Sequence, residues 1–176
     1  MNCQYNLAEA LVAQQKYEAA EDLFKSSLQD IEKVEPLSSL NRALLLSGLG
    51  RLYLSQNRYS EAEPLLKESL KIRQEILEPN DMDIVNSLDN LAGLYVNKQE
   101  FLKAEPLFKK ALEIKEKTLK PNDPRLASTI NNLATTYSRR GDARAEDLFK
   151  KAISVDNNST YKNNLAWFYL TNKRYD

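Results

Sequence analysis

The sequence contains no histidine and only four glycines. Histidine is the usual general base and a common zinc ligand, so its absence removes the ordinary centre of acid–base chemistry. Gly48 and Gly50 lie inside a helical pattern, which argues against a glycine-rich loop that could hold phosphate. From these shortages we expect a protein that is not an enzyme and has no metal and no cofactor.

The sequence also has a single cysteine and a net charge of zero. Cys3 is the single cysteine, so no internal disulfide can form, and a reducing compartment is favoured. The 25 Lys and Arg residues balance 25 Asp and Glu residues, which predicts no nucleic-acid partner and no binding to an anionic membrane. No apolar run approaches the roughly 20 residues of a membrane span, and residues 1–9 do not resemble a signal peptide. These features predict a cytoplasmic protein.

What the sequence does contain is a repeat. Tyr53, Tyr95 and Tyr137 are spaced 42 residues apart. A fixed period of this kind is the signature of a stack of similar units. Apolar residues with helical spacing occur twice in each period, so each unit is predicted to be an antiparallel helix hairpin. Four further columns share the 42-residue spacing: Leu49, Leu91 and Leu133; Gly50, Ala92 and Ala134; Tyr17, Tyr59 and Phe101; Ala20, Ala62 and Ala104.

Helix-capping residues follow the same period. Ser39, Asp81 and Asp123 each precede a helical pattern and are good N-cap residues. We expect Pro36 to interrupt the first hairpin. Pro64, like its counterpart 42 residues later, is expected near the start of the second helix of its hairpin, where its missing N–H would fall among unpaired donors.

The predicted array is one domain over residues 1–176, and its register changes after Tyr137. One residue is lost near Gly141, and the connection to the next unit is shorter. Tyr175 follows Tyr169 at the spacing of an unfinished hairpin, so we expect a fragment of a longer protein. The predicted repeats are residues 2–38, 39–80, 81–122 and 123–157, with a half-repeat over residues 158–176.

The columns resemble the tetratricopeptide repeat. In the first helix, the family pattern is a Leu, a small residue and an aromatic, which here are Leu91, Ala92 and Tyr95. In the second helix, the pattern is an aromatic, Ala, Phe and Ala, which here are Phe101, Ala104, Phe108 and Ala111. The 42-residue length and the segments over residues 131–134 and 104–107 are similar to the repeats of kinesin light chains. The resemblance implies an all-α, right-handed solenoid of about four and a half repeats, in which first helices line a concave face.

The concave positions can be read by their offset from the core leucine. Asn stands one residue before the core leucine in four of five units, although Asn is a mediocre helix former. Its carboxamide can both donate to and accept from a peptide backbone, which is the use the resemblance implies; the alternative is an inherited structural contact. The candidate peptide-binding residues are Asn90, Asn132, Asn131, Asn164, Arg51, Asp89, Asn97, Arg139 and Thr135.

The predicted function is therefore a non-catalytic module that binds an extended peptide of a partner protein. The concave positions carry no lysine, which disfavours the carboxylate clamp known in the family. Two alternatives remain open. The array could be an architectural spacer, or a segment that self-associates through its unfinished C-terminal repeat; it could also be a regulatory sensor arm of a larger multidomain protein.

Overall fold

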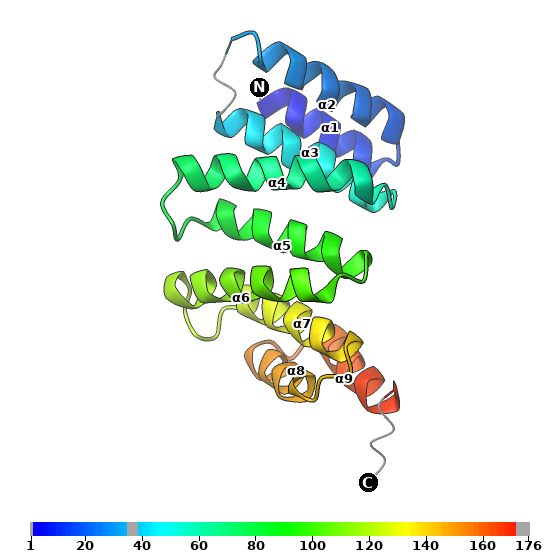
Figure 1. The fold of residues 1–176 in the computed structure, drawn as a ribbon, viewed down its shortest axis with the longest axis vertical. Helices are drawn as coiled ribbons and strands as arrows, with labels where there is room; N and C mark the ends of the chain where they lie inside the picture. The colour runs from blue at the N-terminus through cyan, green and yellow to red at the C-terminus, as the bar shows by residue number, and fades with distance from the viewer. Residues whose placement is uncertain (1, 35–38, 172–176) are drawn as a thin grey trace. The chain divides into compact units, whose positions relative to one another are not determined.

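The computed structural model describes residues 2–34 and 39–171, and the regular structure in these residues is entirely helical (Figure 1). The chain divides into two compact units, Met1–Pro79 and Asn80–Asp176. Pro36 and Tyr175, for which the sequence made predictions, lie outside the described residues.

The first unit holds two helix hairpins. Its helices are α1 (Asn2–Ala13), α2 (Tyr17–Ile31), α3 (Leu40–Ser55) and α4 (Tyr59–Ile76). Helices α1 and α2 form one pair and α3 and α4 the next, while α3 also packs against α2 and α1. Each hairpin thus buries one face within itself and another against its neighbour, as expected for stacked repeats.

The second unit repeats this plan. It contains α5 (Met82–Asn97), α6 (Phe101–Thr118), α7 (Pro124–Arg139), α8 (Arg144–Val155) and α9 (Ser159–Thr171). Helix α5 pairs with α6 and α7 with α8, and α6 packs against α7; α9 then packs against α8 and α7. In Figure 1 these successive helices lie side by side along the green-to-red part of the chain.

The predicted columns form the core of both units. The alanines and glycine of the small-residue columns are buried, which lets neighbouring helices approach closely. The tyrosine and leucine columns fill the space that remains, and Phe24, Phe108 and Phe149 are among the most completely buried side chains. The outer aromatic column differs, because Tyr17 and its counterparts are only half-buried.

The three predicted N-caps are confirmed. The Ser39 hydroxyl accepts the backbone N–H of Arg42 at 3.1 Å. The Asp81 carboxylate accepts the N–H of Asp83 at 2.7 Å, and Asp123 does the same for Arg125 at 2.9 Å. Each cap satisfies a donor that the first turn of its helix leaves unpaired.

The prediction for the prolines was wrong. Pro64 lies six positions into α4, inside the helix and beyond the first turn, and Pro106 lies at the same place in α6. Only the first four N–H groups of a helix lack an intrahelical acceptor. Pro64 therefore removes a hydrogen bond that Ser60 C=O would otherwise accept, a cost that both long helices carry.

The turn inside each hairpin uses a left-handed residue at a fixed register. Gln15, Asn57 and Gln99 each have φ 60°, and Gly141 has φ 70°. These four positions are 42 residues apart, and the N–H that follows each one donates to the C=O five residues earlier at 2.8–3.0 Å. Only Gly141 adopts this conformation without steric cost.

The fourth turn also locates the lost residue. Because Gly141 and the hydrogen bond from Asp142 N–H to Tyr137 C=O keep the 42-residue register, the deletion lies after Asp142. The residue that would carry the outer aromatic side chain is the one removed. The Asp142 side chain instead accepts the N–H of Arg144, the first residue of α8, at 3.0 Å.

The two outermost helices depart from the predicted core. Leu7 in α1 was expected in the leucine column but is 55% exposed. In α9, Ala166 is exposed and Tyr169 half-buried, whereas Phe168 is buried with its ring 6.1 Å from that of Phe149. The reason is that each of these helices packs against described helices on one side of the stack.

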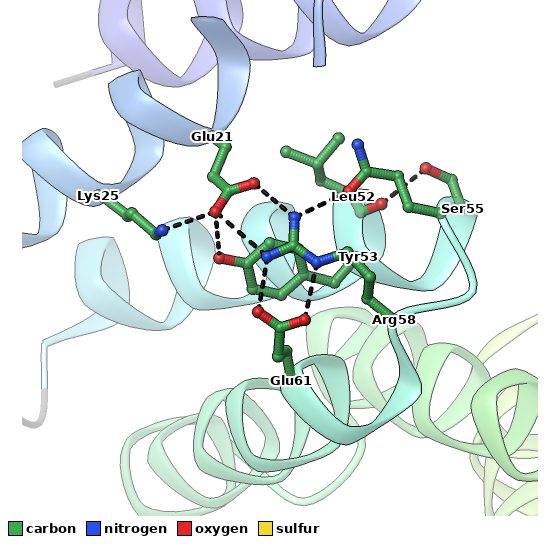
Figure 2. Close-up of polar contacts among 8 residues, drawn as sticks. Glu21, Lys25, Leu52, Tyr53, Ser55, Arg58 and Glu61 are labelled. Carbon is green, nitrogen blue, oxygen red and sulfur yellow. Dashed lines mark hydrogen bonds and ion pairs between the residues drawn. The ribbon is translucent and has the colours of Figure 1, made fainter. Parts of the chain in front are cut away.

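In the first unit, a glutamate of the first hairpin binds the tyrosine column of the second. Figure 2 shows the carboxylate of Glu21 of α2 joined by dashed lines to Tyr53 of α3 and to Arg58, which lies in the turn after α3. The Tyr53 hydroxyl donates to Glu21 Oε1 at 2.9 Å, and Arg58 Nη1 lies 2.6 Å from Glu21 Oε2. Arg58 also pairs with Glu61 and lies 4.0 Å from the centre of the Tyr53 ring. We call the cluster of Glu21, Lys25, Tyr53, Arg58 and Glu61 the glutamate clasp.

The second unit contains two equivalents of this clasp. The Tyr137 hydroxyl donates to Glu105 at 2.9 Å, and Lys109 and Arg140 also bind that carboxylate. The Tyr169 hydroxyl donates to Glu146 at 2.9 Å. The shared arrangement joins one hairpin to the next through a tyrosine that is itself part of the core.

Candidate peptide-binding groove

Two first helices of the second unit present matching polar stripes. On α7 the stripe is Asn132, Thr135 and Arg139, and on α9 it is Asn164, Trp167 and Thr171. Both sets have the spacing i, i+3, i+7, which places their members on one helix face. They are the positions that the sequence assigned to the concave side of the repeats.

A groove runs between these stripes. Its volume is about 290 Å³, and most of its lining comes from the predicted concave positions of α7 and α9: Thr135, Ser138, Arg139, Phe149, Asn164, Trp167 and Thr171. The structure thus brings together three candidates from the sequence, Thr135, Arg139 and Asn164. Asn132 lies one turn along the same stripe and is exposed.

The groove combines several kinds of recognition chemistry. The Trp167 side chain is 62% exposed and offers a flat apolar surface with one N–H donor. Arg139 is exposed and supplies a cation. Asn164 and Thr135 add amide and hydroxyl groups that can bond a main chain. Such a site suits a segment with an apolar side chain and a free backbone.

Asn131 does not line the open face as the sequence predicted. Its side chain is only 7% exposed, and its Oδ1 accepts a hydrogen bond from Asn164 Nδ2 at 2.9 Å. Its carbonyl oxygen accepts from the Thr135 hydroxyl, also at 2.9 Å. Helix α9 covers Asn131, so this residue orients Asn164 and Thr135 of the groove and does not itself lie on the open face.

Asp89 also differs from the prediction. Its Oδ2 forms an ion pair with the buried Lys115 Nζ at 3.0 Å. The same Nζ also donates a hydrogen bond to the Thr129 hydroxyl at 2.5 Å. Burial raises the pKa of the Asp89 carboxyl, although the attraction of Lys115 opposes this. The carboxylate thus joins α5 and α6 to α7 within the unit and is committed to a structural contact.

Arg51 lies in the first unit, apart from the groove of the second. It pairs with Glu9 of α1, and its Nη2 is 3.5 Å from the Tyr5 hydroxyl. Gly48 occupies the place that holds Asn in the other repeats, because a Cβ there would lie 2.6 Å from the Phe24 ring. The charge of Arg51 is therefore engaged by the preceding repeat of the same unit.

The stripe on α5 remains separate from the groove. Asn90 is half-buried and Asn97 exposed, and neither lines the cavity between α7 and α9. Between them, Gly93 leaves open space, since a Cβ there would meet no atom within 4 Å. This part of α5 offers a shallow polar surface.

Ser138 and Phe149 are groove residues that sequence reasoning missed. Phe149 belongs to the buried column of second helices, and it also lines the groove, where the Phe168 ring of α9 lies 6.1 Å from its own. Ser138 lies five residues after the core Leu133, outside the four offsets used for prediction, which are two and one residues before the core leucine and two and six residues after it. The shortened connection was visible in the sequence, but its effect on these two residues was not.

Two further findings concern the described part of the chain alone. Within residues 2–34 and 39–171, no three acidic or cysteine side chains gather in a way that could hold a metal ion. None of the helices formed by these residues has both the length and the apolar character needed to cross a bilayer.

Several solved structures share this fold. The protein from Podosopora anserina with nearly identical TPR-like repeats of the kinesin light chain kind matches with a TM-score of 0.87 at 21% identity, covering 99% of this chain and 87% of that one. BtubC (BKLC) from P. vanneervenii matches with a TM-score of 0.82 at 23% identity over 93% and 69% of the two chains. YrrB, a TPR protein with an unusual peptide-binding site, matches with a TM-score of 0.66 at 17% identity over 98% and 78%.

No relative was found among the curated proteins. The structural matches confirm the predicted all-α fold class and the likeness to kinesin-light-chain repeats. The family model of the tetratricopeptide repeat matches residues 1–75 and 83–158, which is most of the sequence. The chain belongs to the tetratricopeptide repeat family.

Proposed function

We propose that this chain binds an extended peptide segment of a partner protein across the first helices of its second unit. Tetratricopeptide domains generally act as protein-interaction modules, and their repeats create extended binding surfaces. The observation that carries the proposal is the groove of about 290 Å³ lined by equivalent positions of α7 and α9. The peptide-binding site of the distant structural neighbour YrrB is consistent with this use of the fold.

Each residue on the groove side would contact the part of the ligand that suits its chemistry. Asn132 and Asn164 would hold the ligand backbone, while Arg139 would bind a carbonyl or carboxylate oxygen. Trp167 would cover an apolar side chain, because stacking on an exposed indole buries area at little entropic cost. Asn131 would keep Asn164 in place through their hydrogen bond, so its effect on binding is indirect.

The test begins with selection of ligands from a displayed peptide library on the full chain, followed by calorimetry. The double variant Asn132→Ala with Arg139→Ala should weaken a selected peptide by about tenfold or more, since each lost hydrogen bond costs about 1 kcal/mol and one to a charged group more. A matched control, Asn157→Ala with Lys110→Ala, removes one amide and one cation from exposed positions elsewhere. Equal binding by both double variants would refute the groove.

Self-association is a second candidate, favoured by a specific feature of α9. Leu170 is 55% exposed there, close to the exposed Trp167. Neighbouring apolar side chains on one helix mark an association surface more often than isolated ones do. Sedimentation velocity over a range of concentrations would detect association, which Leu170→Glu should abolish; a monomer at every concentration would eliminate this candidate.

A further inference from the structure

A second recess lies away from the groove, at the turn between α5 and α6. Its volume is about 560 Å³, and six residues line it: Gln99, Glu100, Phe101, Leu102, Lys103 and Arg140. The first five form the turn and the start of α6, and Arg140 follows the last residue of α7. Leu102 is 73% exposed, and the half-buried Phe101 ring lies beside it in sequence.

The same recess exists in the first unit with different chemistry. There the volume is about 460 Å³, and the lining residues stand 84 positions earlier: Gln15, Lys16, Tyr17, Glu18, Ala19 and Gln56. The location is thus a property of the repeat, since two units produce it independently. What differs is its surface, because Glu18 is replaced by Leu102 and Tyr17 by Phe101.

The substitutions make the second recess apolar at its centre. Stacking of the repeats does not require a leucine at position 102, because the equivalent positions hold Glu18 and Ser60. An exposed leucine beside an aromatic ring leaves apolar surface in water, which burial by a partner would remove. The feature therefore indicates a ligand side chain that is itself apolar.

Charge around the recess indicates what accompanies that side chain. Lys103 and Arg140 stand where the first unit has Ala19 and Gln56. Lys103 and Lys98 both pair with Glu100, and Arg140 pairs with Glu105. The lining itself holds two cations, Lys103 and Arg140, and one carboxylate, Glu100, whereas the lining of the first recess holds one of each, Lys16 and Glu18. The recess of the second unit is therefore the more positive of the two, and complementary charge favours encounter with an acidic partner.

We propose that this recess is a second binding site, which takes a partner segment with a large aliphatic side chain next to a carboxylate side chain. The aliphatic group packs on Phe101 and Leu102, and the carboxylate lies near Lys103 and Arg140. The site is distinct from the groove because the two share no lining residue: the recess lies at the α5–α6 turn with Arg140, and the groove lies between α7 and α9. A partner could therefore occupy either surface without the other.

Nitrogen–proton correlation spectra of the full chain provide the test, with N-acetyl-Leu-Glu-amide as the probe. Shift changes should centre on residues 99–103 and 140. N-acetyl-Ala-Glu-amide and N-acetyl-Leu-Lys-amide should each bind several-fold more weakly, because one lacks the aliphatic group and the other the carboxylate. Equal affinity for the three probes, or shifts spread over other helices, would overturn the proposal.

Two variants make the test specific to the recess. Leu102→Glu gives this position the residue of the first unit and should weaken N-acetyl-Leu-Glu-amide by about tenfold. The reciprocal triple variant Glu18→Leu, Ala19→Lys, Gln56→Arg should create a second set of shifts at residues 15–19. Unchanged binding by the first variant, or no new site in the second, would overturn it, as would probe-free shifts that grow with protein concentration and thus indicate a second copy of the chain.

Discussion

Gly48 and Gly93 both lie in helix interiors, yet their surroundings differ. A Cβ on Gly48 would approach the buried Phe24 ring at 2.6 Å, whereas a Cβ on Gly93 would meet nothing within 4 Å. Gly48→Ala should therefore lower the free energy of unfolding by about 1 kcal/mol or more through overpacking. Gly93→Ala should raise it by about 0.5–1 kcal/mol through helix propensity. Urea unfolding checks both, and the same sign for the two would contradict this account.

The left-handed turn residues give a second prediction at this scale. Gln99 has φ 60°, a conformation that costs a side-chain-bearing residue about 1–2 kcal/mol. Gln99→Gly should therefore stabilise the protein by up to about 1 kcal/mol, despite the entropy that glycine adds to the unfolded chain. Gly141→Gln is the reverse control and should destabilise by a similar amount in thermal unfolding. Stabilisation by Gly141→Gln would show that the turn is not strained.

Single-residue placement was only partly predictable from the sequence. The caps at Ser39, Asp81 and Asp123 were predictable because N-cap chemistry is local. The burial of Asn131 and Asp89 was not, because it depends on α9 and on Lys115, which approach from other parts of the chain. The repeated left-handed turn was within reach, since Gly141 stands in one 42-residue column with Gln15, Asn57 and Gln99.

At the scale of helices, the glutamate clasp makes the free energy of unfolding depend on pH in the acidic range. The hydrogen bonds of Glu21, first from Arg58 and then from Lys25 and Tyr53, lower the pKa of its carboxyl to about 2. Lys109 is the main cause of the same pKa of about 2 for Glu105. Both folded values lie below the unfolded value of about 4.3. The stabilisation is therefore complete above the unfolded pKa and is lost as the pH falls through the folded pKa.

The measurement is the melting temperature between about pH 5 and pH 2. The wild type should lose stability steeply across this window. Glu21→Gln should start less stable and change less with pH, because the titrating group is gone. Glu18→Gln, exposed on the same helix, is the matched control and should follow the wild type. A Glu21→Gln curve parallel to that of the wild type would contradict the linkage.

The sequence predicted which helices form, but it did not predict where single residues such as Pro64 and Phe168 lie in them. Each hairpin followed from the 3.6-residue spacing of apolar side chains and its 42-residue recurrence. Pro64 was misplaced because α4 begins at Tyr59, directly after the turn, and so encloses the proline. Phe168 was missed as a core residue because the columns assign the core position to Tyr169, whereas in α9 it is the Phe168 ring that is buried and lies 6.1 Å from that of Phe149.

For the whole molecule, the fold class followed from the repeat and the binding surface only in outline. The concave offsets predicted Thr135, Arg139 and Asn164, which line one groove. They also gave equal weight to Arg51, which Glu9 engages within the first unit. Sequence columns treat all repeats alike, whereas the groove lies beside α9, which follows the shortened connection after α8.

The emission of Trp167, the chain's single tryptophan, tests the central claim most directly. A peptide selected on the full chain should shift or quench this emission as it fills the groove, with the Kd found by calorimetry. Asn132→Ala with Arg139→Ala should weaken the optical and calorimetric signals together. A peptide that binds with full calorimetric heat while the emission of Trp167 stays constant, and that tolerates the double variant, would contradict the account.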